Sequence, residues 1–147
     1  MNWVFKKFDE LSTIELYDIL KLRSEIFVVE QKCFYQDLDD KDKFCYHLFL
    51  EDADEIIAAL RIIPENVSYS EMAIGRVVVK KSYRNQGIAT KMMQKAIDLI
   101  INHFNKNKIK LSGQAHLIDF YIKLGFKKVS NSYMDAGIKH YEFLNQI

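Results

Sequence analysis

The sequence predicts a single mixed α/β or α+β domain, and three observations support this prediction. Its 147 residues match the roughly 100–200 residues of one domain. Apolar runs with strand-like alternation and with helical spacing follow one another, which gives about seven strands and three or four helices. One proline and five glycines leave no room for a flexible linker. We therefore treat residues 1–147 as one domain.

The composition argues against several classes of protein. The chain carries 21 Lys and Arg against 20 Asp and Glu, a net charge of +1, so a uniformly basic nucleic-acid surface is not expected. No apolar run reaches the roughly 18 residues of a membrane span, and the N-terminal residues lack a signal-peptide core. Cys33 and Cys45 do not make a disulfide framework. We expect a soluble cytoplasmic protein with neither a membrane nor a nucleic-acid partner.

The first half of the chain predicts one helix among strands. Trp3–Phe8 has the composition of a strand. Ser12, with Glu15 three residues later, forms a capping box, so a helix begins there and runs toward Phe27. Cys45–Glu51 and Glu55–Ile63 are apolar, β-branched runs separated by a short turn. This arrangement predicts an antiparallel hairpin.

The second half continues the alternation. Met72–Lys80 is apolar at successive positions, which indicates a buried strand. From Ile88 to Phe104 apolar residues recur at helical spacing, which predicts an amphipathic helix. Four shorter elements complete the chain: a strand at Ile109–Ser112, a helix at His116–Leu124, and strands at Phe126–Val129 and His140–Leu144.

Charge is distributed unevenly along the chain. Residues 30–55 hold nine acids and three lysines, a net charge of −6, whereas residues 76–97 hold six bases and no acid. Such runs are commonly solvated surfaces. The alternative is a site for an anion at the basic segment and a site for a cation at the acidic one.

The junction between Met72–Lys80 and the following helix is the strongest candidate for a ligand site. The first turn of a helix leaves backbone N–H groups without partners at the positive end of the helix dipole, which suits a pyrophosphate. Gly87 lets phosphate oxygens approach the backbone. Arg84 adds a permanent charge with a planar fork of donors. The ordinary alternative is a tight turn that contains a glycine.

Two motifs extend this pattern. Arg84-Asn85-Gln86-Gly87-Ile88-Ala89 fits Arg/Gln-x-x-Gly-x-Gly/Ala, and Tyr121-Ile122-Lys123-Leu124-Gly125-Phe126 fits Tyr-x-x-x-Gly-Phe. With both motifs on the expected elements, the sequence resembles the GNAT superfamily of acetyl-CoA-dependent N-acetyltransferases. Its similarity to the ElaA-like branch covers most of the chain and is carried by Arg23–Asp42, His47, Ile74–Val77, Gln114–Leu117 and Gly137–His140.

The resemblance implies a GNAT fold, a mixed and mostly antiparallel twisted sheet of about seven strands flanked by about four helices. It implies acetyl-CoA as cosubstrate, bound where the sheet splays, and no metal. The backbone of Val77 and Val79 would pair with pantetheine, and an N–H near Val77 would polarise the thioester carbonyl. Gln114, where many members have Asn, can still offer an amide to pantetheine. The pyrophosphate would be held by Arg84, Asn85, Gln86, Gly87, Ile88, Ala89 and Thr90.

The resemblance also implies catalytic roles. Tyr121 matches the family's tyrosine that protonates the departing CoA thiolate. This transfer runs mildly uphill from a phenol of pKa about 10 to a thiolate of about 8.5. The alternative is a tyrosine packed in the core. The acceptor amine must lose a proton, so a base or a water chain is expected. The candidates for the base are Glu30 and His47, and beside them Asp39, Asp42 and His140.

The function implied is transfer of an acetyl group from acetyl-CoA to an amine of a small molecule or peptide by direct attack. The acidic segment adds the prediction that this acceptor is cationic. The competing interpretation is a non-catalytic module that binds CoA for sensing or assembly. Residues 37–42 lack the Gly and Glu of a calcium loop, and direct transfer needs no cysteine nucleophile. Members of the superfamily often dimerise, and the sequence does not decide between a monomer and a homodimer.

Overall fold

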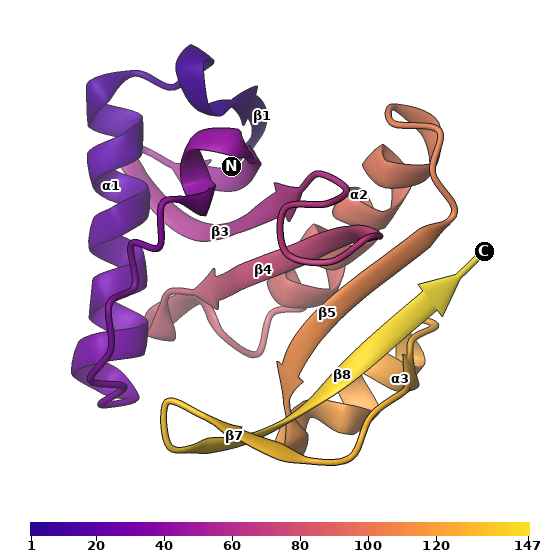
Figure 1. The fold of residues 1–147 in the computed structure, drawn as a ribbon. Helices are drawn as coiled ribbons and strands as arrows, with labels where there is room; N and C mark the ends of the chain where they lie inside the picture. The colour runs from indigo at the N-terminus through magenta and orange to yellow at the C-terminus, as the bar shows by residue number, and fades with distance from the viewer.

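Eight strands form one sheet in the computed structural model, which describes residues 1–147 (Figure 1). The order along the sheet is β1-β2-β3-β4-β5-β8-β6, and β7 also pairs with β8. All pairs are antiparallel except β4 with β5, which is parallel. The strands are β1 (Asn2–Lys7), β2 (Tyr46–Asp52), β3 (Glu55–Ile63), β4 (Met72–Val79), β5 (Lys108–Gln114), β6 (Lys127–Lys128), β7 (Tyr133–Asp135) and β8 (Ile138–Gln146).

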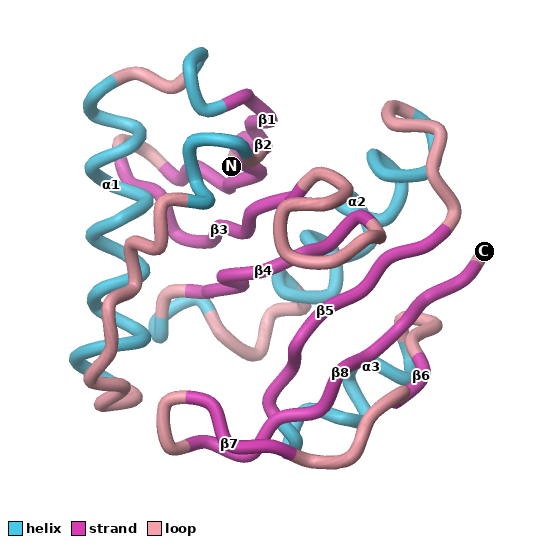
Figure 2. Tube along the Cα trace, in the orientation of Figure 1, coloured by secondary structure: helices cyan, strands magenta, loops and turns pink.

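Helices cover both faces of this sheet, as Figure 2 shows. The α-helices are α1 (Thr13–Arg23), α2 (Ile88–Asn102) and α3 (Ile118–Lys123), and α1 continues into the π-helix η2 (Ser24–Glu30). The capping box at the start of α1 is confirmed, because the Glu15 N–H donates to Ser12 Oγ at 3.0 Å and the Ser12 N–H donates to Glu15 Oε1 at 2.9 Å. The 3-10 turns are η1 (Phe8–Glu10), η3 (Lys41–Phe44), η4 (Lys81–Tyr83) and η5 (Ala115–Leu117).

Side chains along β2 alternate between the two faces of the sheet, and this alternation decides which helix each side chain packs against. Leu48 and Leu50 belong to the larger core cluster, which lies against α2 and α3. Phe49, between them, belongs to the smaller cluster with Ile19 and Leu22 of α1. Successive side chains of a strand point to opposite faces, so one apolar run supplies both cores.

Strands β4 and β5 separate soon after they begin. They pair only at Met72 with Ile109 and at Ala73 with Lys110, and Figure 1 shows them diverging from there. A bulge lies in β4 where its register with β3 shifts, and Arg76 there has a φ of +51°. Bulges bend a strand and increase its twist. Beyond Ala73, β4 therefore presents an unpaired edge toward β5.

The structure refines two details of the prediction. The structure has eight strands rather than about seven, because Tyr133–Asp135 pairs with the start of β8. Three residues are too few to show the alternation of apolar and polar side chains that identifies a strand in a sequence. The helix predicted from Ser12 toward Phe27 is α-helical only to Arg23 and then π-helical, and the Gln31 N–H donates to the Ile26 carbonyl. None of the helices is both long enough and apolar enough to cross a membrane.

Candidate active site

The start of α2 has the geometry that its sequence predicted. Gly87 is the N-cap with a φ of +76°, and a Cβ built there would meet no atom within 4 Å. The first helical hydrogen bond runs from the Lys91 N–H to the Gly87 carbonyl at 3.1 Å. The N–H groups of residues 88–90 therefore have no partner within the helix. This junction combines backbone donors with open space beside a glycine.

Arg84 is already paired at this junction. Its Nη1 and Nη2 donate to the two carboxylate oxygens of Glu30 at 2.7 and 3.2 Å. Its Nε donates to the Val79 carbonyl at 3.0 Å. Glu30, one of the base candidates, thus lies beside the predicted phosphate site and not on the cavity described next.

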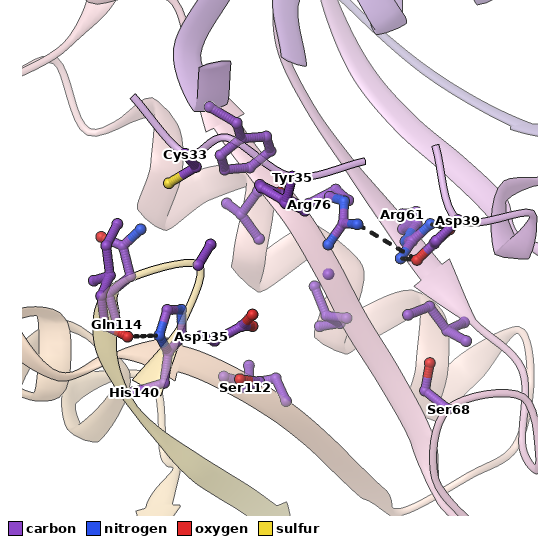
Figure 3. A pocket seen from close by; sticks show the side chains of 18 of the residues that line it. Cys33, Tyr35, Asp39, Arg61, Ser68, Arg76, Ser112, Gln114, Asp135 and His140 are labelled. Atoms are coloured by element: carbon purple, nitrogen blue, oxygen red, sulfur yellow. Dashed lines mark hydrogen bonds and ion pairs between the residues drawn. The ribbon is translucent and has the colours of Figure 1, made fainter. Parts of the chain in front are cut away.

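A cavity of about 430 Å³ opens between the separated strands (Figure 3). Its wall includes η2, the loop after it, β4, β5 and the β7–β8 hairpin. Three residues predicted for the reaction line it: Tyr121, Val77 and Gln114. Of the base candidates, His140 and Asp39 also line it, and Glu30, His47 and Asp42 do not.

Tyr121 is fixed by apolar packing beside this cavity. Its ring lies 4.8 Å from that of Phe143 and 6.2 Å from that of Phe126, measured between centroids. On β5, a Cβ added to Gly113 would come within 2.5 Å of Tyr121 Cε2. The missing side chain at Gly113 therefore makes room for the ring. Tyr121 is both a core residue and a residue of the cavity wall, so the two interpretations of the sequence combine.

Burial raises the pKa of Tyr121 to about 12. The phenol therefore keeps its proton at neutral pH. A thiolate in the same apolar surroundings is also destabilised by loss of water. The pKa of a departing thiol would rise together with that of the phenol, so burial need not widen the gap between donor and acceptor.

His140 is held in the tautomer that a base requires. Its Nδ1 donates to the Ile138 carbonyl at 2.7 Å, since a carbonyl can only accept. The lone pair is then on Nε2. The ring of Tyr133 stacks on that of His140 at 6.1 Å, and the Tyr133 hydroxyl is hydrogen-bonded to Ser112 Oγ. Strand β7, which the sequence did not reveal, thus supports His140.

His47 has a different environment. It is 2% exposed, and its Nε2 donates to the Asp42 carbonyl at 3.0 Å. Burial lowers the pKa of His47. The neutral ring is engaged in the interior and does not reach the cavity. Its contacts are those of a structural residue.

Three arginines and three aspartates form a buried network along the wall. Arg23 lies between Asp37 and Asp42, with ion pairs of 2.9 Å from Nε and 2.7 Å from Nη1. Arg61 and Arg76 complete the network with four further pairs. Arg61 pairs with Asp39 (Nη2 to Oδ2, 2.7 Å) and with Asp42 (Nη1 to Oδ1, 3.0 Å), and Arg76 pairs with Asp37 (Nε to Oδ1, 2.8 Å) and with Asp39 (Nη2 to Oδ2, 3.4 Å). Figure 3 shows Arg61 and Asp39 together at one end of the cavity.

This network changes the interpretation of the acidic segment 30–55. Its buried Asp37 and Asp42 and its partly exposed Asp39 are neutralised by arginines from α1, β3 and β4. Hydrogen bonds from Arg61 hold the pKa of Asp39 well below its usual range. Burial alone would raise the pKa of Asp42, but Arg23 and Arg61 lower it. The carboxylates are therefore charged but paired, and the segment as a whole does not provide a free cation site. No group of His, Cys, Asp or Glu side chains is arranged to hold a metal ion.

Sequence reasoning missed Arg61 and Gly113 as site residues. Arg61 stands inside the apolar run of β3 and is only 3% exposed. A charged residue within such a run is almost never buried unless it is paired, so this position carried a signal that could have been used. Gly113 carried none, because its role depends on the position of Tyr121 in the folded chain.

Comparisons with known proteins agree on one family. The family described as "Acetyltransferase (GNAT) domain" matches residues 18–143. The chain is 40% identical to a UPF0039 protein of Schizosaccharomyces pombe, over 97% of this chain and 95% of that protein. An acyl-CoA N-acyltransferase from Pseudomonas aeruginosa has the same fold with a TM-score of 0.94 and 34% identity, covering 98% of each chain. Escherichia coli ElaA matches with a TM-score of 0.92 and 33% identity, covering 99% of each chain. The predicted GNAT fold is thereby confirmed, and the chain belongs to the GNAT acetyltransferase family, in its ElaA-like branch.

Proposed function

We propose that this chain transfers an acetyl group from acetyl-CoA to an amine by direct attack of the amine on the thioester. One observation carries the proposal: a single cavity at the splay of the sheet is lined by Tyr121, Val77 and His140. These residues supply an acid, an open strand edge and a base at one place. Membership of an acyl-transferring family supports the same reaction class.

Acetyl-CoA would lie along the β4 side of the splay. Its pantetheine arm would pair with the free edge of β4 at Val77 and Val79, and the amide of Gln114 faces the same cavity. Its pyrophosphate would be held by the residues Arg84 to Thr90. Because Glu30 already accepts from both Nη groups of Arg84, we assign most of the phosphate contact to backbone N–H groups beside Gly87.

The proposed chemistry balances at each group. The amine nitrogen bonds to the acetyl carbon while a backbone N–H near Val77 stabilises the negative charge that develops on the carbonyl oxygen. The carbon–sulfur bond then breaks, and the CoA thiolate takes the proton of Tyr121. The arriving ammonium group gives one proton to His140 Nε2, directly or through one water, before its nitrogen attacks. The second proton, which the nitrogen loses after the attack, passes to the Tyr121 phenolate. Glu30 and His47 have less favourable positions for this step, since both are engaged outside the cavity.

The proposed acceptor is a small-molecule or peptide amine that arrives as a cation. The acidic segment no longer supports this prediction, because its buried carboxylates are paired. Asp135 supports it instead. This carboxylate lines the cavity near His140 (Figure 3) and takes part in none of the ion pairs of the structure. It can attract an ammonium group to the place where the base lies.

A panel of amines with acetyl-CoA tests the proposal. Acetylated product, detected by mass, should appear together with an equal amount of free CoA thiol, and cationic aliphatic amines should react faster than neutral aromatic amines. Equal turnover of both kinds would contradict the cationic acceptor. If acetyl-CoA binds but no amine releases thiol, the chain is instead a non-catalytic CoA-binding module.

A further inference from the structure

Two charged side chains on the cavity wall have no counter-ion, and they lie toward opposite ends. Asp135 stands beside His140 in Figure 3, whereas Ser68 stands at the other end with Arg61 and Asp39. Lys41 also lines the cavity, and its Nζ donates to Ser68 Oγ at 3.0 Å. No carboxylate lies within ion-pair distance of Lys41. The unpaired ammonium group of Lys41 therefore belongs to the Ser68 end.

The charges near Lys41 leave that end of the cavity positive. The buried network contains three arginines and three aspartates, so it contributes no net charge. Lys41 adds one positive charge that nothing in the chain offsets. At the opposite end Asp135 adds one unpaired negative charge. The cavity therefore has a dipole along its length.

Arg61 adds a second, independent source of positive potential at this end of the cavity. Its Nη1 and Nη2 donate to Asp39 and Asp42, but its Nε is buried and has no hydrogen-bond partner. This nitrogen lies 3.7 Å from the position of a Cβ on Gly75, and both residues line the cavity. A buried donor without a partner is costly. This unpaired donor adds to the positive potential at the Lys41 end of the cavity, but the atom is covered and does not itself contact a ligand there.

We infer that the acceptor is an amine that also carries a carboxylate. The carboxylate binds Lys41 and the Arg61 end of the cavity, and the ammonium group lies beside Asp135 and His140. A cavity of about 430 Å³ limits this ligand to a small molecule or to the end of a peptide. The inference rests on the proposed acetyl transfer, because it takes the bound amine as the group that is acetylated.

The test compares amino acids of increasing length with their amides. The probes are β-alanine, γ-aminobutyrate, δ-aminovalerate and ε-aminocaproate, each paired with its carboxamide. A charge-assisted hydrogen bond is worth enough to change KM about tenfold or more. We expect each free carboxylate to have the lower KM, with the largest difference at the chain length that spans from Asp135 to Lys41.

Two lysine variants separate this site from general electrostatics. Lys41→Met should remove the preference for the carboxylates and leave the KM of the amides unchanged. Lys43→Met is the matched control, because Lys43 is exposed and pairs with Asp40; it should keep the preference. Asp135→Asn should raise the KM of carboxylates and amides alike, because it weakens binding of the amine end.

The outcomes distinguish the inference from the proposed function. If wild-type protein acetylates the amides as efficiently as the carboxylates, or if Lys41→Met keeps the preference, the inference is wrong and acetyl transfer stands. If no probe is acetylated, calorimetric titration of the CoA-bound protein with ε-aminocaproate decides. Binding that Lys41→Met weakens about tenfold would support the ligand site without turnover, and binding that is absent or unchanged would overturn it.

Discussion

The two sides of the gap between β4 and β5 are built from different chemical groups. On the β4–α2 side, the proposed cofactor site consists of backbone groups and one glycine within a short run, residues 77–90. On the opposite side, the wall of the cavity beyond β4 is formed by side chains from η2, the loop after it, β3, β5 and the β7–β8 hairpin. A backbone site depends on local geometry and tolerates many side chains. A site of side chains depends on the whole fold and can change its ligand by single substitutions.

Tyr121→Phe should have the largest effect, because Tyr121 serves both sides. Loss of the proton donor should lower kcat by about ten- to ten-thousandfold, the range of general-acid catalysis. The affinity for acetyl-CoA should change little, since the ring and its packing against Phe143 are retained. Single-turnover kinetics with calorimetry measures the two quantities separately. An unchanged rate would show that Tyr121 is not the acid.

Gly87→Val tests whether the cofactor side depends on the backbone. A side chain there would fill the open space beside the first N–H groups of α2. Losing charge-assisted hydrogen bonds of about 1.5–3 kcal/mol each should weaken acetyl-CoA binding on the order of a hundredfold or more. Calorimetric titration with acetyl-CoA provides the measurement.

Gly137→Val is the matched control for this substitution. Gly137 has a φ of +78° and the same open surroundings, so the backbone strain is equivalent, but it lies in the turn before β8. Acetyl-CoA affinity should be unchanged in this variant. Equal loss in both variants would mean that strain, and not the phosphate site, explains the effect.

Arg23→Met tests whether the acceptor side depends on its buried side chains. Removing Arg23 leaves Asp37 with only Arg76 and Asp42 with only Arg61 as ion-pair partners. Breaking a buried pair costs about 3–5 kcal/mol of unfolding free energy. Urea unfolding measures this loss, and a loss below about 1 kcal/mol, as at a surface pair, would contradict the role of the network.

A surface ion pair provides the control for Arg23→Met. Lys6→Met breaks the partly exposed pair with Glu15 and should cost at most about 1 kcal/mol of unfolding free energy.

The stability of the protein should also depend on pH in the acid range. Because the pKa values of Asp39 and Asp42 are lowered from 3.8, the network stabilises the protein above about pH 4 and loses this contribution as the pH falls further. Arg23→Met should flatten that acid dependence, because Asp42 then titrates closer to its ordinary pKa.

Gly113→Ala should have a smaller effect on kcat than Tyr121→Phe, and it acts through Tyr121. A Cβ at this position must displace the ring, and a small misplacement of the acid should lower kcat about tenfold. In a Tyr121→Phe background the same substitution should have no further effect on kcat. A full additional loss there would show that Gly113 serves only packing.

The sequence predicted those features whose cause is local. The capping box of α1, the hairpin of β2 and β3, and the start of α2 at Ile88 follow from neighbouring residues. The short strand β7 could not be predicted, because its pairing with β8 depends on a partner and not on its own three residues. The π-helical turn after Arg23 has no separate signal, since the same residues suit an α-helix.

The residues of the candidate site likewise divide into those that local motifs predict and those that only the fold brings together. Gly87 and Tyr121 stand in motifs of consecutive residues, so a resemblance was enough to single them out. The pairing of Arg61 with Asp39 joins residues 22 positions apart, and only the folded sheet brings them together. The same holds for Asp135 and Lys41, whose significance lies in what surrounds them. Acceptor recognition was therefore the part that the sequence could not resolve.

Arg76 limits how this chain can diversify. It occupies the β4 bulge, and its side chain holds the loop after η2 through Asp37. A substitution that reshapes this loop for a new substrate would also disturb the strand that carries Val77. The β7–β8 hairpin has no such bond to β4. New specificities are therefore more accessible to evolution through the turn of this hairpin at Ala136, where a change leaves the proposed reacting residues Val77 and His140 in place.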